Sequence, residues 1–188
     1  MISTLPMIRD PTQLASDGKP IVLAESYAII KYLDRTYPDK PVIPEGTDAL
    51  QTAWMKFVWT VVVSKISPIY LPRGPSILSE RAKEYFIRTR NEWLGPLDKM
   101  CPDEDKAWAE VEEGFSQVAA ALDVNGVEEG RNLQVIPGQT SYADFVVLGV
   151  LLWGQTVISQ EKLDEIRNWN GGRWGKILDM HKDLTRIV

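Results

Sequence analysis

The residues best suited to bind a ligand lie near the start of the chain, at Leu5–Pro6 and Glu25–Ser26. A proline that opens an apolar run can adopt a cis peptide bond, a state rarely populated without a structural reason. Such a bend would present the backbone N–H and C=O of Leu5 to a ligand. Ser26 stands where a helix is predicted to begin, and helix N-termini bind anions because their dipole is positive there. Glu25 has the charge to pair with an ammonium group, so together these residues predict a site for a zwitterion.

A purely structural role explains the second pair as well. Ser26 would then cap the helix, and Glu25 would complement the positive end of the helix dipole. Serine caps are far commoner than ligand sites, so the spacing alone favours capping over ligand binding.

A second motif, Ser141-Tyr142-Ala143-Asp144, precedes a long apolar run. It has the spacing of a capping box, with Asp144 in place of the usual Glu or Gln. The side chain of Ser141 can accept from the N–H of residue 144, and Asp144 can reach back to the N–H of Ser141. The motif predicts a role in folding rather than in catalysis.

The chain contains one cysteine, Cys101, and one histidine, His181. An intrachain disulfide is impossible, and a structural zinc site, which needs roughly four Cys or His ligands, is excluded. No metal is expected. The count leaves a Cys–His catalytic pair open, although the motif context of such enzymes is missing. The simpler alternatives place Cys101 in a loop before Pro102 and His181 on a solvated helix face.

Turn residues mark a short region of strands at the start of the chain. The apolar run Leu5–Ile8 and the β-branched run Ile21–Leu23 predict two strands. Arg9-Asp10-Pro11 and Asp17-Gly18-Lys19-Pro20 are predicted to be turn residues between them. Because Pro6 cannot donate a ladder hydrogen bond, the first strand is an edge strand or begins there.

Helical spacing accounts for the rest of the chain. A first helix opens at Glu25-Ser26 and ends at Tyr37-Pro38. Three prolines and a glycine make residues 38–46 a stiff connector. After it, strand signals are weak and apolar stripes predict helices. Ser141–Trp153 is expected to be the buried central helix, followed by a short helix around Leu163–Trp169 and a last one around Trp174–His181.

Composition indicates a folded, soluble protein. Of the 188 residues, 44% are hydrophobic and 25% are charged, which favours a packed core over disorder. The net charge is −5 and basic residues form no run, so neither nucleic acid nor an anionic membrane is expected as a partner. The longest apolar run is about half a membrane span, and no signal-peptide pattern is visible. A cytoplasmic location is therefore expected.

These residues also resemble a known family. Leu5–Ile8 and Ile21–Leu33 look like the third strand, fourth strand and third helix of the thioredoxin-like domain of glutathione transferases. The proline-rich connector and the helical remainder fit that family, and the Ser141/Asp144 box resembles the folding signature of its sixth helix. The Leu-Pro-Met-Ile-Arg-Asp-Pro stretch and the Trp-rich helix after the connector are similar to fungal transferases of the etherase-related, UstS-like type.

The resemblance implies a mainly α fold. A partial thioredoxin-like fragment of two strands and one helix would cover residues 1–37, a connector 38–46, and an all-helical C-terminal domain 47–188. Glutathione would be the co-substrate, its cysteinyl part held by the backbone at Leu5 beside a cis Pro6 and its γ-glutamyl end by Glu25 and Ser26. The family carries its thiol-activating residue on a first strand, so the resemblance places the catalytic residue upstream of Met1, together with that strand, a helix and a second strand.

Several functions stay open on the sequence. A glutathione transferase would join the thiol to a hydrophobic, aromatic electrophile or cleave aryl ethers, and family members are often homodimers. Because the thiol-activating segment is missing, a non-catalytic protein that binds aromatic ligands or acts as a regulator is the alternative. A purely helical interaction module is a third function, against which the retained Pro6 and Glu25–Ser26 argue. Candidates for the acceptor pocket, for which core or domain-interface packing is an equally good explanation, are Trp54, Phe57, Val58 and Tyr70.

Overall fold

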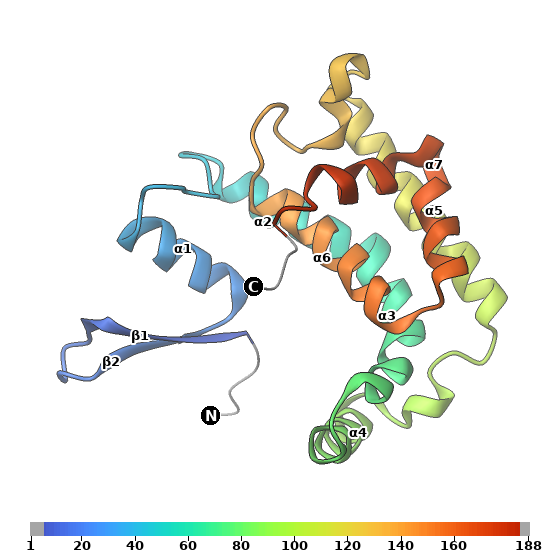
Figure 1. Cartoon of the computed structure of the whole chain (residues 1–188), viewed down its shortest axis with the longest axis horizontal. Helices are drawn as coiled ribbons and strands as arrows, with labels where there is room; N and C mark the ends of the chain where they lie inside the picture. The colour runs from blue at the N-terminus through green and yellow to red at the C-terminus, as the bar shows by residue number, and fades with distance from the viewer. Residues whose placement is uncertain (1–5, 185–188) are drawn as a thin grey trace. The chain divides into compact units, whose positions relative to one another are not determined.

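The structure, a computed structural model, describes residues 6–184 and is mainly helical (Figure 1), which confirms the expected fold class. The chain divides into two compact units, Met1–Gln51 and Thr52–Val188. The strands and helices, with the short 3-10 and π turns labelled η, are β1 (Met7–Leu14), β2 (Pro20–Ala24), α1 (Ser26–Thr36), α2 (Asp48–Val58), η1 (Trp59–Val63), α3 (Ser64–Tyr70), η2 (Leu71–Ile77), α4 (Glu80–Leu94), η3 (Leu97–Lys99), α5 (Glu104–Asp123), η4 (Glu128–Leu133), α6 (Tyr142–Val157) and α7 (Gln160–Met180).

The first unit is built on an antiparallel hairpin of β1 and β2. Strand β1 runs on through Arg9-Asp10-Pro11, so the prediction that these are turn residues is wrong. The register shifts between Asp10 and Leu14, and such a bulge tolerates a proline that cannot donate to the ladder. The predicted turn at Asp17-Gly18 is confirmed, with Gly18 at φ 76° and its N–H bonded to the carbonyl of Ala15 at 2.9 Å.

Helix α1 also holds the connector that follows it. The carboxylate of Asp34 accepts hydrogen bonds from the backbone N–H groups of Val42 at 3.1 Å and Ile43 at 2.8 Å. Lys31 forms an ion pair with Asp48 at 2.6 Å. Charged side chains of α1 therefore hold the middle of the connector and the start of α2, which follows it.

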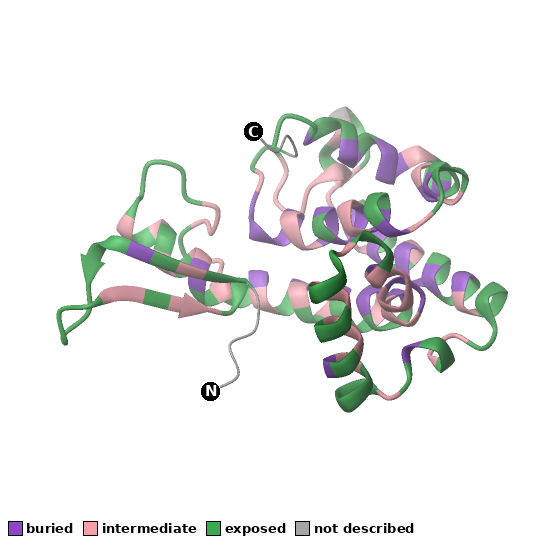
Figure 2. Cartoon of the chain, turned by 60° about the horizontal axis from the view of Figure 1, so that its bottom comes forward, coloured by how far each residue is buried: buried purple, intermediate pink, exposed green. Residues whose placement is uncertain are grey.

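The second unit contains a packed helical core. Its buried residues lie along α2, α3, α5, α6 and α7, and Figure 2 shows the burial concentrated on the inward faces of these helices. Aromatic rings make up much of this core: Phe115 packs on Trp174 with ring centroids 4.8 Å apart, and Tyr70 packs edge-on against Trp153 at 5.0 Å. All seven tryptophans belong to this unit: Trp54, Trp59, Trp93, Trp108, Trp153, Trp169 and Trp174.

The central helix of this core is α6, as its apolar sequence predicts. It begins with the capping box of Ser141 and Asp144. The carboxylate of Asp144 accepts from the N–H of Ser141 at 2.7 Å, from its hydroxyl at 3.0 Å, and from the N–H of Val135 at 2.8 Å. Asp144 is only 5% exposed, and its burial raises the pKa of the carboxyl although the donors act in the opposite direction. The box thus ties α6 to the preceding loop as well as capping it.

Helix α7 is two helical segments separated by a break at Trp169–Gly172, as the spacing of its apolar residues predicts. Asn170, Gly171 and Gly172 all have positive φ, a conformation that glycine and asparagine adopt most easily. The side chain of Asn170 accepts from Trp174 Nε1 at 2.9 Å and donates to Ser116 Oγ at 3.0 Å. These bonds fix the break against α5.

The two residues that a Cys–His pair would need have other surroundings. Cys101 lies in the loop before Pro102, as expected, and its burial together with Glu104 raises the pKa of its thiol, which disfavours the reactive thiolate. The expected solvated position of His181 is wrong, because the residue is 2% exposed. Its ring lies 2.9 Å from the carbonyl oxygen of Ile177 and packs near Phe145. Within residues 6–184, no helix is long and apolar enough to cross a membrane.

Candidate functional site: the open end of the hairpin and a groove on the helical unit

The hairpin register brings the two predicted ligand-binding segments together. Met7 of β1 pairs with Ala24 of β2, so Pro6 and Glu25 are each the next residue beyond that pair. Ser26 follows as the first residue of α1, and all three residues are exposed. Leu5 and its bond to Pro6 lie outside the described residues. Pro6, Glu25 and Ser26 therefore lie at one end of the hairpin, where a small ligand can reach all of them.

Glu25 has an unusual backbone conformation. The chain passes from Ala24 in β2 to Ser26 in α1 through this single residue, which has φ 74° and ψ 117°. Within the described residues, only Asn170 is another non-glycine residue with positive φ. Strained backbone of this kind is concentrated at binding and catalytic sites. Nothing in the residue type of Glu25 indicates the strain, so sequence reasoning missed it.

The start of α1 suits a negatively charged group. The first intrahelical bond runs from the N–H of Ile29 to the carbonyl of Glu25 at 2.9 Å. The helix has no acidic residue in its first turn and Arg35 in its last, so no carboxylate of that turn offsets the positive end of the dipole. Ser26 is the first helical residue and Glu25 is the N-cap, without a side-chain capping bond. Ser26 is therefore one residue beyond the N-cap position that the capping explanation gave it.

A buried carboxylate on β1 fastens the hairpin to α1. One oxygen of Asp10 accepts from the N–H and the hydroxyl of Thr12 at 2.9 and 2.7 Å. The other accepts from the hydroxyls of Tyr32 and Tyr37, both at 2.6 Å. Hydrogen bonds from Tyr32, Tyr37 and Thr12 hold the pKa of Asp10 well below its usual range. Burial and the bond to Asp10 raise the pKa of Tyr32 to about 12.

We expect the pKa of Asp10, followed by the side-chain carboxyl signal in an NMR titration, to lie below the ordinary value of 3.8. Because the folded-state pKa is the lower one, Asp10 stabilises the fold above about pH 4, and this contribution is lost as the pH falls through the folded-state pKa. The hydrogen bond from Tyr32 is the largest cause of the lowered pKa of Asp10. Tyr32→Phe removes it and should move the titration midpoint of Asp10 back towards 3.8. A midpoint unaffected by Tyr32→Phe would contradict the assignment.

The four residues predicted for an acceptor pocket are found in or against the core of the helical unit. Val58 and Tyr70 are each 1% exposed, Trp54 is also buried, and Phe57 is half-buried against the core. The rings of Trp54 and Phe57 contact each other, with centroids 5.6 Å apart. These four residues therefore pack in or against the core, which is one of the explanations that the sequence left open for them. Substrate contact by these four side chains stays a prediction.

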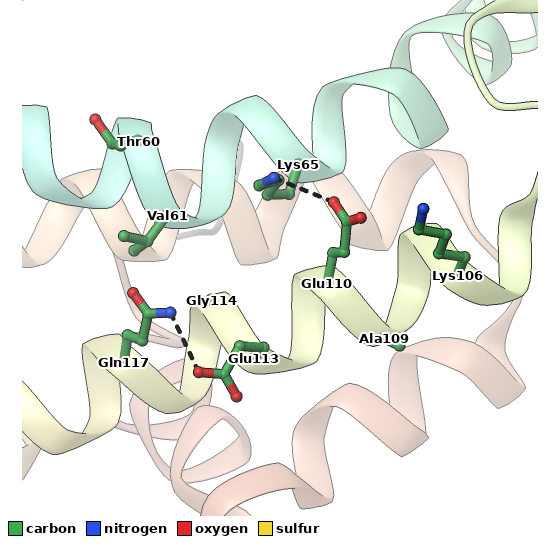
Figure 3. Close-up of a pocket in the computed structure, with 9 residues that line it drawn as sticks. All are labelled: Thr60, Val61, Lys65, Lys106, Ala109, Glu110, Glu113, Gly114 and Gln117. Atoms are coloured by element: carbon green, nitrogen blue, oxygen red, sulfur yellow. Dashed lines mark hydrogen bonds and ion pairs between the residues drawn. The ribbon is translucent and has the colours of Figure 1, made fainter.

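The helical unit also has an open groove of about 550 Å³ between η1–α3 and α5 (Figure 3). Val61, Ala109 and Gly114 form its apolar part, and α5 approaches η1 so closely that a Cβ on Gly114 would lie 1.9 Å from the carbonyl oxygen of Val61. Lys65 and Glu110 form an ion pair at 3.1 Å on its wall. Sequence reasoning did not find this groove, because it depends on how two distant helices pack.

Comparison with known proteins agrees with these features. The family model of the glutathione S-transferase C-terminal domain matches residues 49–184, well over half of the chain. This chain belongs to the glutathione transferase superfamily. The resemblance found in the sequence is thereby confirmed.

Particular glutathione transferases and related proteins are similar along almost the whole chain. The glutathione S-transferase-like protein ustS of Aspergillus flavus is 30% identical over 179 residues, which cover 91% of this chain and 63% of that protein. A glutathione S-transferase of Ceriporiopsis subvermispora, solved in complex with glutathione, has a TM-score of 0.79 and 30% identity, covering 95% of this chain and 78% of that one. Glutathione transferase GSTFuA3 of Phanerochaete chrysosporium has a TM-score of 0.81 and 27% identity, covering 95% and 77%.

Proposed function

We propose that this chain binds glutathione at the open end of the hairpin and takes part in joining it to a hydrophobic, aromatic electrophile. The observation that carries the proposal is the pairing of Met7 with Ala24, which brings Pro6 and Glu25, and with Glu25 the start of α1 at Ser26, to the same end of the hairpin. The Ceriporiopsis transferase that resembles this chain was solved with glutathione bound, which supports the same ligand. Cleavage of aryl ethers is the variant of this reaction that the etherase-related resemblance suggests.

In this proposal, each charged part of glutathione meets a group of opposite character. The γ-glutamyl carboxylate lies at the N-terminus of α1, where the Ser26 hydroxyl donates to it and the helix dipole favours it. The γ-glutamyl ammonium pairs with the carboxylate of Glu25. The cysteinyl part lies along the backbone at Leu5, next to Pro6. Residues 1–37 then act as the thioredoxin-like part, 38–46 as the connector and 47–188 as the helical domain.

Isothermal titration of the full chain with glutathione tests this binding site. We expect Ser26→Ala to raise the Kd about tenfold, because one hydrogen bond to a charged group is lost. Ser159→Ala is the matched control, since Ser159 is also a serine at a helix start and its side chain accepts from the N–H of Lys162 at 3.3 Å. Its Kd should stay within about twofold of the parent. An unchanged Kd in Ser26→Ala, or no binding by the parent chain, would remove the proposed site.

A second function, binding aromatic ligands without turnover, is favoured by the groove between η1–α3 and α5. Its volume of about 550 Å³ lies in the range of small-molecule sites. A steady-state assay with glutathione and a general aromatic electrophile separates the two functions. Turnover by the chain excludes the binding-only role, and ligand binding without turnover excludes the transferase role.

A further inference from the structure

We propose that Asp10 is a positioning residue for the glutathione site, fastening α1 to the hairpin so that Ser26 stays beside Pro6. The inference rests on the proposed function of that site. Asp10 itself does not touch the ligand. It acts through the two tyrosine hydroxyls that it accepts from, and through the backbone that joins them to Ser26.

The position of Asp10 on the strand makes it suited to this role. It lies three residues from Met7, whose pairing with Ala24 sets the geometry of the open end. Its carboxylate reaches Tyr32 in the second half of α1 and Tyr37 at the C-cap of that helix. The segment from Pro6 to Asp10 thus contacts the later part of α1 through Asp10 at one end and has Pro6 at the other.

A carboxylate is the group that this cluster requires. An ionised Asp accepts at both oxygens and donates nothing, so four donors can converge on it. Thr12 supplies two of them and the tyrosine hydroxyls the other two at 2.6 Å, a distance typical of charge-assisted bonds. The Tyr37 hydroxyl also lies 2.7 Å from that of Thr12. An amide at position 10 has an NH₂ group where one accepting oxygen was, so it cannot hold all four donors.

The strained backbone of Glu25 explains why the site depends on this fastening. A conformation such as φ 74° persists only where the surrounding structure holds it from both sides. On the strand side it is held by the pairing of Ala24 with Met7. On the helix side α1 is held by Asp10 through Tyr32 and Tyr37. Releasing the helix would move Ser26 away from Pro6, while Glu25 and Ser26, which are consecutive in the chain, stay together.

The test compares two ligands in Asp10→Asn and in a control variant. Glutathione spans the helix start and the strand end, whereas free glutamate can engage only Glu25 and Ser26. We expect Asp10→Asn to raise the Kd of glutathione about tenfold and to leave that of glutamate within about twofold. The control is Asp34→Asn, which makes the same chemical change at a carboxylate of α1. Asp34 is bonded to the connector rather than to the hairpin. It should leave both constants within about twofold of the parent.

Two results would overturn the positioning role. One is a glutathione Kd in Asp10→Asn within about twofold of the parent. The other is an equal loss of affinity for both ligands, which indicates general unfolding of the first unit. Tyr32→Phe and Tyr37→Phe provide a second set of variants that keep the carboxylate, and each should weaken glutathione binding less than Asp10→Asn does.

Hydrogen exchange separates failure of this inference from failure of the proposed function. If the parent chain does not bind glutathione, the proposed function fails, and the fastening is judged from the exchange of the hydrogen-bonded backbone amides of α1, which begin at Ile29. Faster exchange there in Asp10→Asn than in Asp34→Asn supports the fastening. Equal exchange in the two variants overturns it.

Discussion

Replacing Asp144 with alanine should lower the free energy of unfolding of the helical unit by about 3 kcal/mol. The carboxylate is buried and accepts three hydrogen bonds, from the N–H and hydroxyl of Ser141 and the N–H of Val135. Alanine leaves these donors without an acceptor at the start of the central helix. Urea denaturation followed by far-UV circular dichroism measures the effect.

Asp103→Ala is the matched control for this substitution. Asp103 caps α5 by accepting from the N–H of Lys106 at 3.0 Å, and it is exposed. Its loss should cost about 1 kcal/mol, the usual value for a solvent-exposed cap. Equal losses in the free energy of unfolding for Asp144→Ala and Asp103→Ala would contradict a larger contribution from the buried capping box.

Gly114→Ala is expected to be as damaging as the loss of Asp144, at about 3 kcal/mol. The added methyl would lie 1.9 Å from the carbonyl oxygen of Val61 in η1. Since the obstacle is backbone rather than a flexible side chain, α5 and η1 must move apart, and the buried residues beside them lose contacts. The same urea experiment reports the change, with an unchanged slope showing that the unfolding remains cooperative.

Gly149→Ala shows what the same substitution does without a close neighbour. Gly149 lies within α6, is exposed, and has nothing within 4 Å of the position that the added methyl would take. Alanine forms helix better than glycine, so this variant should gain about 1 kcal/mol. A loss of stability in both glycine variants would show that helix packing is not the cause in Gly114→Ala.

Local sequence patterns predicted the features that depend on neighbouring residues. The spacing of Ser141 and Asp144 indicated the capping box, and the apolar run after them indicated the central helix. The turn at Asp17-Gly18 and the break in α7 also follow from residues close together in the sequence. These features need only backbone propensities and a few local hydrogen bonds.

Features that depend on distant contacts were not predictable in this way. Asp10 and Pro11 read as turn residues, yet Asp10 is a strand residue whose partners, Tyr32 and Tyr37, lie more than twenty residues away. His181 was expected on a solvated helix face, but it is buried, with its ring near that of Phe145. The meeting of Pro6 with Glu25–Ser26 was expected from the family resemblance, whereas the strained backbone between them appeared only in the structure.

The distribution of tryptophans determines which events an optical experiment can see. Because every indole belongs to the helical unit, intrinsic tryptophan fluorescence follows the unfolding of that unit. The first unit contributes only tyrosine emission, from Tyr27, Tyr32 and Tyr37. Detachment of α1 from the hairpin would thus hardly change the tryptophan fluorescence during thermal unfolding. A single transition in that fluorescence would not show that both units unfold together.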